Sequence, residues 1–515
     1  MMQNAKAARG FFAICLAAAW AVSPQGANGQ GCPGSLQQSS GPDVIVGTIA
    51  QSQGSQQISN YVSAGGIEVF SIGTTSCNLG DTTLAWIAGN NQHPVIGQNA
   101  YRLKMDPAGY LQFEQLGQSW LKHGFCALSE NACCNNCQST GCSNLGIGCS
   151  DPYTAGRNAE QSNLGPKYQV NATTGVFTYP PANPAWSGTV DRRLQVKIAD
   201  LEVSNSNHTT DIADEPRYYA EAQYITQDDA AAGHKKNNVS WRPINLTGSG
   251  TIWTFGVWDT PNPPGASGGA TRRMEAAIRA WEDVDPGITI KEGVTQEEGA
   301  DTATVIVGSQ ATDLGNGMWH YEFAVQNLNS HRSFQSFNVD IQKNATVTNV
   351  GFHDVDYHSG EPYTNTDWTN SIVDTSPVTN TVRWEGETFD ENSNANALRW
   401  ASLYNFRFDA DVPPLWTGKG TVTLDYFRPS AGDPADISVF VAGPTPCTPS
   451  DLNGDGCTNA LDIAVYNDIV LGLVAPTADQ VCSGDLVLPV GQVTLAEADA
   501  FVAGLIDATG TSCAP

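Results

Sequence analysis

The stretch Trp319-His320-Tyr321-Glu322-Phe323-Ala324-Val325-Gln326 gives the clearest indication of the fold of this chain. Large apolar residues occupy every second position, and the residues between them are mostly polar. Successive side chains of a β-strand point to opposite faces, so this alternation predicts a strand with one buried face. The turn sequence Gly315-Asn316-Gly317 lies just before it and suits a hairpin connection.

Similar segments recur along the chain. Short β-branched or aromatic runs, separated by Gly, Asn and Ser, lie at 44–49, 67–72, 84–87, 337–341, 404–408, 422–426 and 439–441. This pattern predicts a mainly β protein, with a β-rich N-terminal region at 30–299 and an antiparallel β-sandwich at 300–443. One helix is predicted within this body, at 272–283, where Met274, Ile278 and Trp281 share a face.

The first 29 residues have the layout of a secretory signal peptide. Lys6 and Arg9 precede an apolar run at 11–22, and small and polar residues follow as far as Gly29. The alternative is a membrane span, but the run is shorter than the roughly 20 residues that a spanning helix needs. We therefore expect a secreted protein, extracellular or at the cell surface, with no membrane span.

The charge balance narrows the choice of partners. The chain has 25 Lys and Arg against 52 Asp and Glu, a formal net charge of −27. Nucleic acid and anionic lipid both require basic patches, so this balance argues against both. The segment 447–515 has nine acidic residues and no Lys or Arg, which suits a module that binds a cation.

Cysteines are concentrated in one Asn-, Ser- and Gly-rich segment, 126–149. Its six cysteines are Cys126, Cys133, Cys134, Cys137, Cys142 and Cys149. Export and an even number of cysteines beyond the predicted signal peptide favour disulfides. The alternative is zinc, because Cys134 and Cys137 have C-x-x-C spacing. The sequence does not give the connectivity of the disulfides.

Residues 451–462, D-L-N-G-D-G-C-T-N-A-L-D, have the spacing of an EF-hand calcium loop. The predicted ligands stand at positions one, three, five, seven, nine and twelve: Asp451, Asn453, Asp455, Cys457 through its backbone carbonyl, Asn459 and Asp462. Gly456, at position six, permits the tight coil that gathers oxygens around one hard cation. The alternative is a surface turn rich in Asp and Asn that binds no metal.

An apolar stripe follows this loop directly. Leu461, Val465, Ile469 and Leu473 are spaced by four residues, as on one face of a helix that leaves the loop.

The segment resembles the first half of a type I dockerin. Dockerins are small calcium-dependent modules that attach secreted bacterial proteins to cohesin-bearing scaffolds, and they consist of two loop–helix units. The resemblance covers 447–515 and implies a second unit, which residues 491–497 match at positions six to twelve. Apolar residues stand where the other acidic ligands of that second loop belong (Leu486, Leu488 and Val490), so we expect calcium in the first loop alone.

The positions that many dockerins use for cohesin recognition differ here from the family pattern. Positions ten and eleven are Ala460-Leu461 in the first unit and Leu495-Ala496 in the second. The resemblance therefore implies calcium as the cofactor, and a cohesin-like or other cell-surface scaffold protein as the partner.

The densest polar cluster of the body follows a predicted strand that ends near Phe352. An extended chain would place Asp354, Asp356 and His358 on one face, and together with His353 they form a candidate second metal site. The alternative is a structural loop, because aspartates commonly cap turns at the ends of strands.

His93 and His123 form a further candidate pair. The sequence does not give the distance between them, and hydrogen-bonded structural histidines are the alternative.

The sequence contains no G-x-S-x-G or H-E-x-x-H motif. Paired carboxylates for glycoside cleavage are recognised by their separation in space, so the sequence does not rank the candidates Glu114, Glu361, Glu385 and Glu387. We expect a secreted calcium-binding protein, a non-catalytic surface or matrix component anchored through the dockerin-like module. The alternative is an extracellular polysaccharide-degrading hydrolase that carries the same module.

Overall fold

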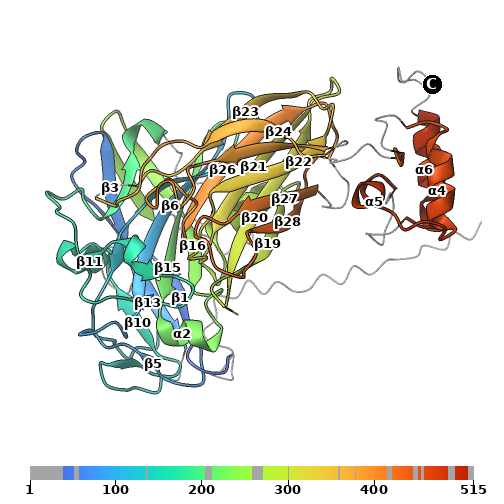
Figure 1. The fold of residues 1–515 in the computed structure, drawn as a ribbon. Coiled ribbons are helices and arrows are strands. Elements are labelled where there is room, and N and C mark those ends of the chain that lie inside the picture. The colour runs from blue at the N-terminus through green and yellow to red at the C-terminus, as the bar shows by residue number, and fades with distance from the viewer. Residues whose placement is uncertain are drawn as a thin grey trace, which may run out of the picture.

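The computed structural model describes residues 39–50, 57–134, 137–202, 211–257, 271–299, 301–357, 360–376, 379–414, 420–444, 450–453, 458–484 and 493–507. The predicted signal peptide, His358 and residues 454–457 of the calcium loop lie outside this part of the chain. Within it the fold is mainly β, as predicted, and the longest helices are in the tail (Figure 1). No helix of the described residues is long and apolar enough to cross a membrane.

The N-terminal unit is built on a large antiparallel sheet. Its main path is β17 (Ile252–Val257), β16 (Val239–Ser249), β15 (Arg217–Ile225), β6 (Val95–Met105), β7 (Leu111–Gln118), β14 (Leu194–Lys197), β3 (Ile67–Ile72) and β2 (Ile58–Asn60). Three short strands pair beside this path: β8 (Leu121–Lys122), β11 (Leu164–Gly165) and β18 (Arg272–Arg273).

Smaller sheets and short helices surround this sheet. A three-stranded sheet contains β1 (Val44–Ile49), β4 (Thr74–Asn78) and β10 (Ser150–Tyr153), and two-stranded pairs join β5 (Leu84–Ala85) to β9 (Asn144–Leu145) and β12 (Val170–Asn171) to β13 (Val176–Phe177). The helical turns are α1 (Ala155–Asn158), η1 (Gln161–Asn163), η2 (Lys167–Gln169), η3 (Ile198–Asp200), α2 (Gln227–Ala232), η4 (Ala277–Arg279) and α3 (Ala280–Val284).

The cysteine-rich segment is held by disulfides, as predicted. The pairs are Cys77–Cys133, Cys126–Cys142 and Cys137–Cys149, and Cys134 is also disulfide-bonded. Cys133 therefore pairs outside the segment, with a strand residue of β4, and ties this long loop to the three-stranded sheet.

Two five-stranded sheets form the predicted antiparallel sandwich. One has the order β19 (Thr289–Gln296), β20 (Thr302–Asp313), β21 (Trp319–Asn327), β26 (Ser402–Ala410) and β23 (Val347–His353). The other has the order β24 (Thr369–Asp374), β25 (Thr379–Glu385), β22 (Ser336–Gln342), β27 (Gly420–Asp425) and β28 (Asp436–Val441). Their facing apolar side chains form one core, which includes Phe323, Phe406 and Trp384. β19 lies before residue 300, so the sandwich begins earlier than the sequence pattern indicated.

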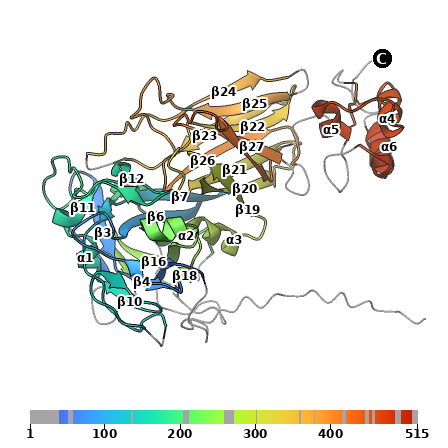
Figure 2. The ribbon, with the colours of Figure 1, turned by 60° about the horizontal axis from the view of Figure 1, so that its bottom comes forward.

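The prediction that β21 has only one buried face is wrong. Tyr321, Phe323 and Val325 do face the sandwich core. The alternating residues, however, are also buried: His320 is 4 %, Glu322 1 % and Gln326 0 % exposed. The reason is that the N-terminal sheet covers this side of the strand, and Figure 2 shows β6 and β7 next to β21 and β26.

Hydrogen bonds between buried polar groups join the two sheets at this interface. Gln326 donates through Nε2 to both carboxylate oxygens of Glu221 on β15, at 3.2 and 3.1 Å. The Asn405 amide donates to the backbone carbonyl of Phe113 on β7 at 2.8 Å. Gln115, also on β7, accepts at Oε1 from the backbone N–H of Leu403 at 2.7 Å. Buried polar groups are costly unless they are paired, so these contacts fix how the two units meet.

The helix predicted at 272–283 is largely wrong. Arg272 and Arg273 pair with β16 as a short strand, and Met274 adopts a positive φ of 60°. Helical structure begins only at Ala277. The spacing of Met274, Ile278 and Trp281 suggested one face, but Met274 is 43 % exposed and lies outside the helix.

The tail contains α4 (Asp462–Val470), α5 (Ala478–Gly484), η5 (Leu495–Glu497) and α6 (Ala498–Asp507). Val465 and Ile469 belong to its small core, but α4 ends before Leu473, and Leu461 and Leu473 are exposed. The apolar stripe is therefore shorter than the sequence spacing indicated.

The His320 ring should make interface stability depend on pH. Burial lowers its pKa, but hydrogen bonds to Glu322 and Asp409 outweigh that effect and raise the pKa above 6.5. The bonds are 3.4 Å to Glu322 and 2.6 Å to Asp409, and Tyr110 stacks on the ring. The pKa of His320 is higher in the folded protein than in the unfolded chain, so the charged ring stabilises the fold. This stabilisation is fully present below pH 6.5 and is lost as the pH rises through the folded-state pKa.

We therefore expect His320→Gln to lower the free energy of unfolding by about 1–3 kcal/mol at pH 6 and by less at pH 9. Denaturant unfolding of the two proteins at both pH values measures this, with His234→Gln as a matched control away from the interface. An equal loss at both pH values would contradict the role assigned to the charged ring.

Candidate functional site

The predicted calcium loop is closed at its ends by Asp462, the residue at position twelve. Its Oδ1 accepts hydrogen bonds from the backbone N–H groups of Leu452, at 2.7 Å, and Asn453, at 2.9 Å. Its Oδ2 accepts from the N–H of Asn459 at 2.8 Å. These three bonds draw the first and last parts of the loop together. Asp455, Gly456 and Cys457 lie outside the described residues.

The charges in this loop fit a bound cation. Asp451 is 3 % and Asp462 0 % exposed, so two carboxylates are buried within one short loop. The sequence from 447 to 515 offers no Lys or Arg to neutralise them. Calcium prefers carboxylate and carbonyl oxygens, so two carboxylates in one short acidic loop suit this ion. Asp451, Asn453, Asp455, the Cys457 carbonyl, Asn459 and Asp462 are the residues that would hold it.

The two halves of the tail pack on each other through a small core. Leu452, Tyr466 and Ile469 of the first half meet Val493 and Phe501 of the second, and the rings of Tyr466 and Phe501 stack at 4.3 Å. The second half begins with a capping box, in which the Glu497 carboxylate accepts from the backbone N–H of Thr494 at 2.6 Å. Glu497 therefore caps the start of a helix through hydrogen bonds to Thr494.

The structure describes three residues of the predicted second metal cluster and gives them different neighbours. Asp354 accepts a hydrogen bond from Asn396, and Asp356 pairs with Lys197. Burial lowers the pKa of His353, against the opposing charge of Glu114. Among the described residues, no three His, Cys, Asp or Glu side chains gather closely enough to hold a metal ion.

His93 and His123 do meet. Nε2 of His93 lies 3.3 Å from Nδ1 of His123, and both rings are buried among the aromatic side chains of Phe177 and Tyr179. Burial lowers the pKa of both rings, for His123 to about 3. Both imidazoles are therefore neutral at pH 7, and one ring donates a hydrogen bond to the other.

The structure separates the four candidate carboxylates. Glu114 forms a buried ion pair with Arg102 at 2.8 Å, Glu385 pairs with Arg383 at 2.7 Å, and Glu387 accepts from Asn392 at 2.7 Å. Of these four, Glu361 lines the pocket described next, and the other three do not.

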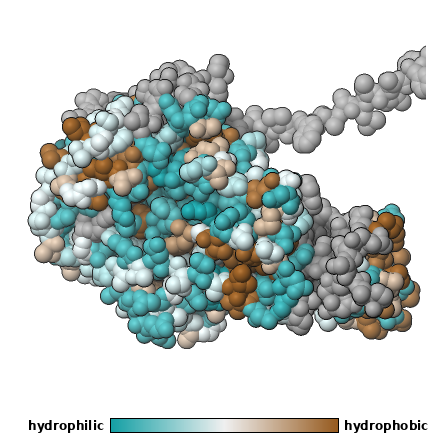
Figure 3. Space-filling model, turned by 90° about the horizontal axis from the view of Figure 1, so that it is seen from above, coloured by the Kyte–Doolittle hydropathy of each residue, from teal (hydrophilic) through white to brown (hydrophobic). Residues whose placement is uncertain are grey.

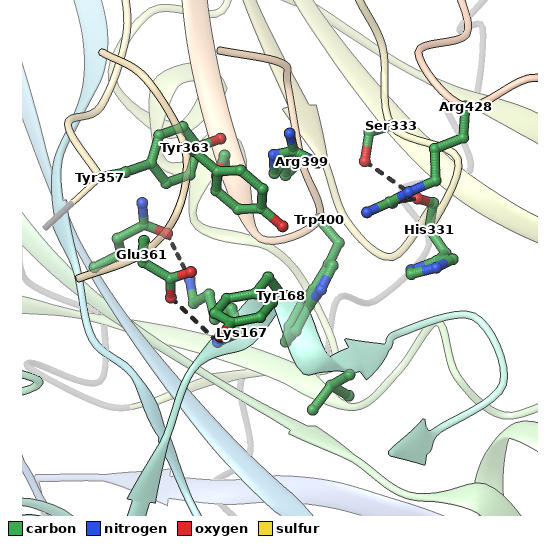
Figure 4. A pocket seen from close by; sticks show the side chains of 13 residues that line it. Lys167, Tyr168, His331, Ser333, Tyr357, Glu361, Tyr363, Arg399, Trp400 and Arg428 are labelled. Carbon is green, nitrogen blue, oxygen red and sulfur yellow. Dashed lines mark hydrogen bonds between the residues drawn. The ribbon is translucent and has the colours of Figure 1, made fainter. Parts of the chain in front are cut away.

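The pocket lies where loops of the sandwich meet the N-terminal unit (Figure 4). Its lining residues are Gln118, Lys167, Tyr168, Val170, His331, Ser333, Tyr357, Glu361, Tyr363, Arg399, Trp400, Ser402 and Arg428. They come from six separate parts of the sequence, and Glu361 is the one carboxylate among them. Sequence reasoning identified only Glu361, because the others follow no recognisable motif.

Glu361 and Arg399 both have unused hydrogen-bonding capacity in this pocket. Oε1 of Glu361 accepts from the backbone N–H of Lys167 at 3.2 Å, whereas its buried Oε2 has no partner in the described residues. Burial raises the pKa of Glu361 to about 7, despite the opposing charge of Lys167.

The guanidinium of Arg399 lies 3.4 Å from the ring centroid of Tyr363, and its buried Nε and Nη1 lack partners in the same described part of the chain. An acceptor and two donors between aromatic walls suit a small polar ligand.

Comparisons with known proteins do not place the chain in a family. No family model and no curated protein matches it. Among solved structures, the exo-β-D-glucosaminidase CsxA is similar at 9 % identity and a TM-score of 0.14. The exo-chitosanase CsxA of Amycolatopsis orientalis gives 8 % and 0.14. In both cases the match covers 75 % of this chain and 26 % of the other, so this chain spans about a quarter of their length.

The collagen adhesin CNA of S. aureus gives 8 % identity and a TM-score of 0.11 over 74 % of this chain and 88 % of the adhesin. Values this low carry no information about function.

The roles assigned to Asp451 and Glu497 predict that only the Asp451 variant loses the stabilisation by calcium. Calcium that binds only the folded tail should stabilise it by about 2.7 kcal/mol at a free concentration one hundred times the Kd. Asp451→Ala should abolish this gain. Glu497→Ala should lower tail stability by about 1 kcal/mol, through the lost cap, yet keep the gain.

Hydrogen exchange of the α4 amides in the full-length chain, with calcium and with chelator, measures both effects. Equal loss of the calcium response in the two variants would show that the second half also binds the metal.

Proposed function

We propose that this protein is an exported, non-catalytic surface or matrix component, and that its calcium-stabilised, dockerin-like tail attaches it to a cohesin-like scaffold protein. The supporting observation is the tail surface. Eight of the 18 exposed large apolar side chains lie in the tail, although its described residues are a small part of the chain. They are Leu461, Ile463, Leu471, Leu473, Val474, Leu495, Val502 and Ile506.

Two of these residues stand at the positions that the dockerin resemblance marks for recognition. Leu461 is 62 % and Leu495 74 % exposed, one in each half of the tail. Figure 3 shows brown, apolar side chains at the end of the molecule that the tail forms. An accumulation of exposed apolar side chains on one small module favours a protein partner. With leucine at these two positions, the tail would contact its scaffold partner through apolar side chains.

A polysaccharide-degrading hydrolase remains the alternative, and the pocket is the observation that favours it. Glu361, with a pKa of about 7, has the protonation behaviour of a general acid. Glycoside cleavage commonly uses two carboxylates about 5–10 Å apart, however, and Glu361 is the one acid among the described lining residues. The pocket thus suits binding of a polar ligand better than hydrolysis.

Capture of the full-length protein by an immobilised cohesin domain tests the attachment proposal. We expect capture in calcium and none in chelator, and at least a tenfold weaker Kd for Leu461→Asp and Leu495→Asp. Ile252→Asp, which changes an equally exposed residue of β17, should bind like the unaltered protein. If calcium loads the tail and no cohesin domain captures it, the metal serves only to fold the tail.

A reducing-sugar assay of the full-length protein on plant and algal polysaccharides tests the alternative. We expect no release of oligosaccharides. Release that disappears in Glu361→Gln would instead establish a hydrolase whose acid is Glu361.

A further inference from the structure

Lys167, the first residue of η2, is buried and has no ion-pair partner in the part of the chain that the structure describes. It is 6 % exposed, and its Nζ donates to two side-chain amide oxygens, Oε1 of Gln118 at 2.8 Å and Oδ1 of Asn99 at 3.3 Å. The nearest carboxylates that influence it, those of Glu361 and Glu221, form no ion pair with it in the described residues. Burial lowers the pKa of Lys167 to about 8, against the opposing charges of these two acids. About a tenth of this amine is therefore uncharged at pH 7, against far less for an ordinary lysine, and the uncharged form is the nucleophile.

The side-chain amide of Asn99, on β6, is placed where the Lys167 amine can attack it. Its side chain is 2 % exposed, and its Nδ2 donates to Oε1 of Glu221 at 2.9 Å. The amide carbon lies one bond, about 1.2 Å, beyond the oxygen that Lys167 contacts. A carboxylate therefore touches the amide nitrogen while an amine touches the amide oxygen. All three groups are shielded from water, because Glu221 is 1 % exposed.

We propose that Lys167 and Asn99 react with each other in the folded protein and form a side-chain amide cross-link. The uncharged Nζ attacks Cγ of Asn99, and a C–N bond forms. The bond between Cγ and Nδ2 breaks, and Nδ2 leaves as ammonia with the proton that Nζ gives up. Glu221 is placed to relay this proton, since its Oε1 contacts the departing nitrogen. Nothing is oxidised or reduced, and no cofactor is consumed.

Folding promotes this reaction by holding the two side chains in contact. Amines and carboxamides do not combine at useful rates in water, but a fixed contact raises the effective concentration of one group at the other by many orders of magnitude. The cross-link would join η2 to β6, the strand that lies next to β15 in the large sheet. It would also remove the cost of keeping the unpaired Lys167 ammonium buried.

Gln118 offers a second amide to the same amine, but its surroundings differ. Its Nε2 donates at 3.4 Å to the backbone carbonyl of Asp356, and a carbonyl does not relay protons as a carboxylate does. The geometry therefore assigns the reaction to Asn99 and leaves Gln118 as a residue that positions the amine.

The mass of the intact, full-length protein after reduction of its disulfides tests the proposal. We expect a mass lower by one ammonia than the sequence from its measured N-terminus requires. A proteolytic digest should yield one branched peptide that joins Lys167 to Asn99. Lys167→Met, which retains an unbranched side chain of similar length, should show the full mass. Glu221→Gln should leave most of the protein uncross-linked.

The measurement on the unaltered protein is decisive even if a variant does not fold. A full mass, with Lys167 and Asn99 in separate peptides, would overturn the proposal. A branched peptide that joins Lys167 to Gln118 would overturn the assignment to Asn99. Complete cross-linking in Glu221→Gln would overturn the proton relay by Glu221.

Discussion

The arrangement of the body depends on the hydrogen bonds that surround the buried carboxylate of Glu221. Asn99 and Tyr101 donate to it from β6, the backbone N–H of Ala277 from η4, and Gln326 from β21. No cation is needed, because each donor contributes a charge-assisted hydrogen bond of about 1.5–3 kcal/mol. These donors come from both β units. Glu221 thereby fixes how the N-terminal sheet sits on the sandwich.

The sequence predicted the strands far better than their surroundings. Period-two alternation identified β21 and its neighbours because pleating alone dictates which residues share a face. It did not show that His320, Glu322 and Gln326 are buried, since a polar residue facing water and one facing a polar partner look the same in a sequence. The failed helix at 272–283 has a related cause. Residues at helical spacing also occur where a short strand, a left-handed residue and a helical turn follow one another, and tertiary pairing with β16 decided the outcome there.

The candidate sites also differ in whether the sequence alone could predict them. The proposed calcium loop could be predicted from the sequence because all its candidate ligands fall within twelve consecutive positions. The pocket was not, because Lys167, Glu361 and Arg399 are brought together from different units by the fold. The meeting of His93 with His123 was raised as a question by the sequence and answered only by the structure. A site whose residues lie close together in the sequence can thus be predicted from it. A site assembled across an interface can be identified only from the structure.

Buried acids in the body and in the tail both accept hydrogen bonds from the chain, but only the tail is proposed to bind a cation as well. In the body, Glu221 is stabilised by amide, hydroxyl and backbone donors of the chain itself. In the tail, Asp451 and Asp462 are buried in a segment without a single Lys or Arg, and the proposed calcium would add to the three backbone N–H bonds that Asp462 already accepts. The proposed attachment would then form only where calcium is plentiful, as it is outside cells. The body would arrive folded in either case, and calcium would control where it is held and leave its structure unchanged.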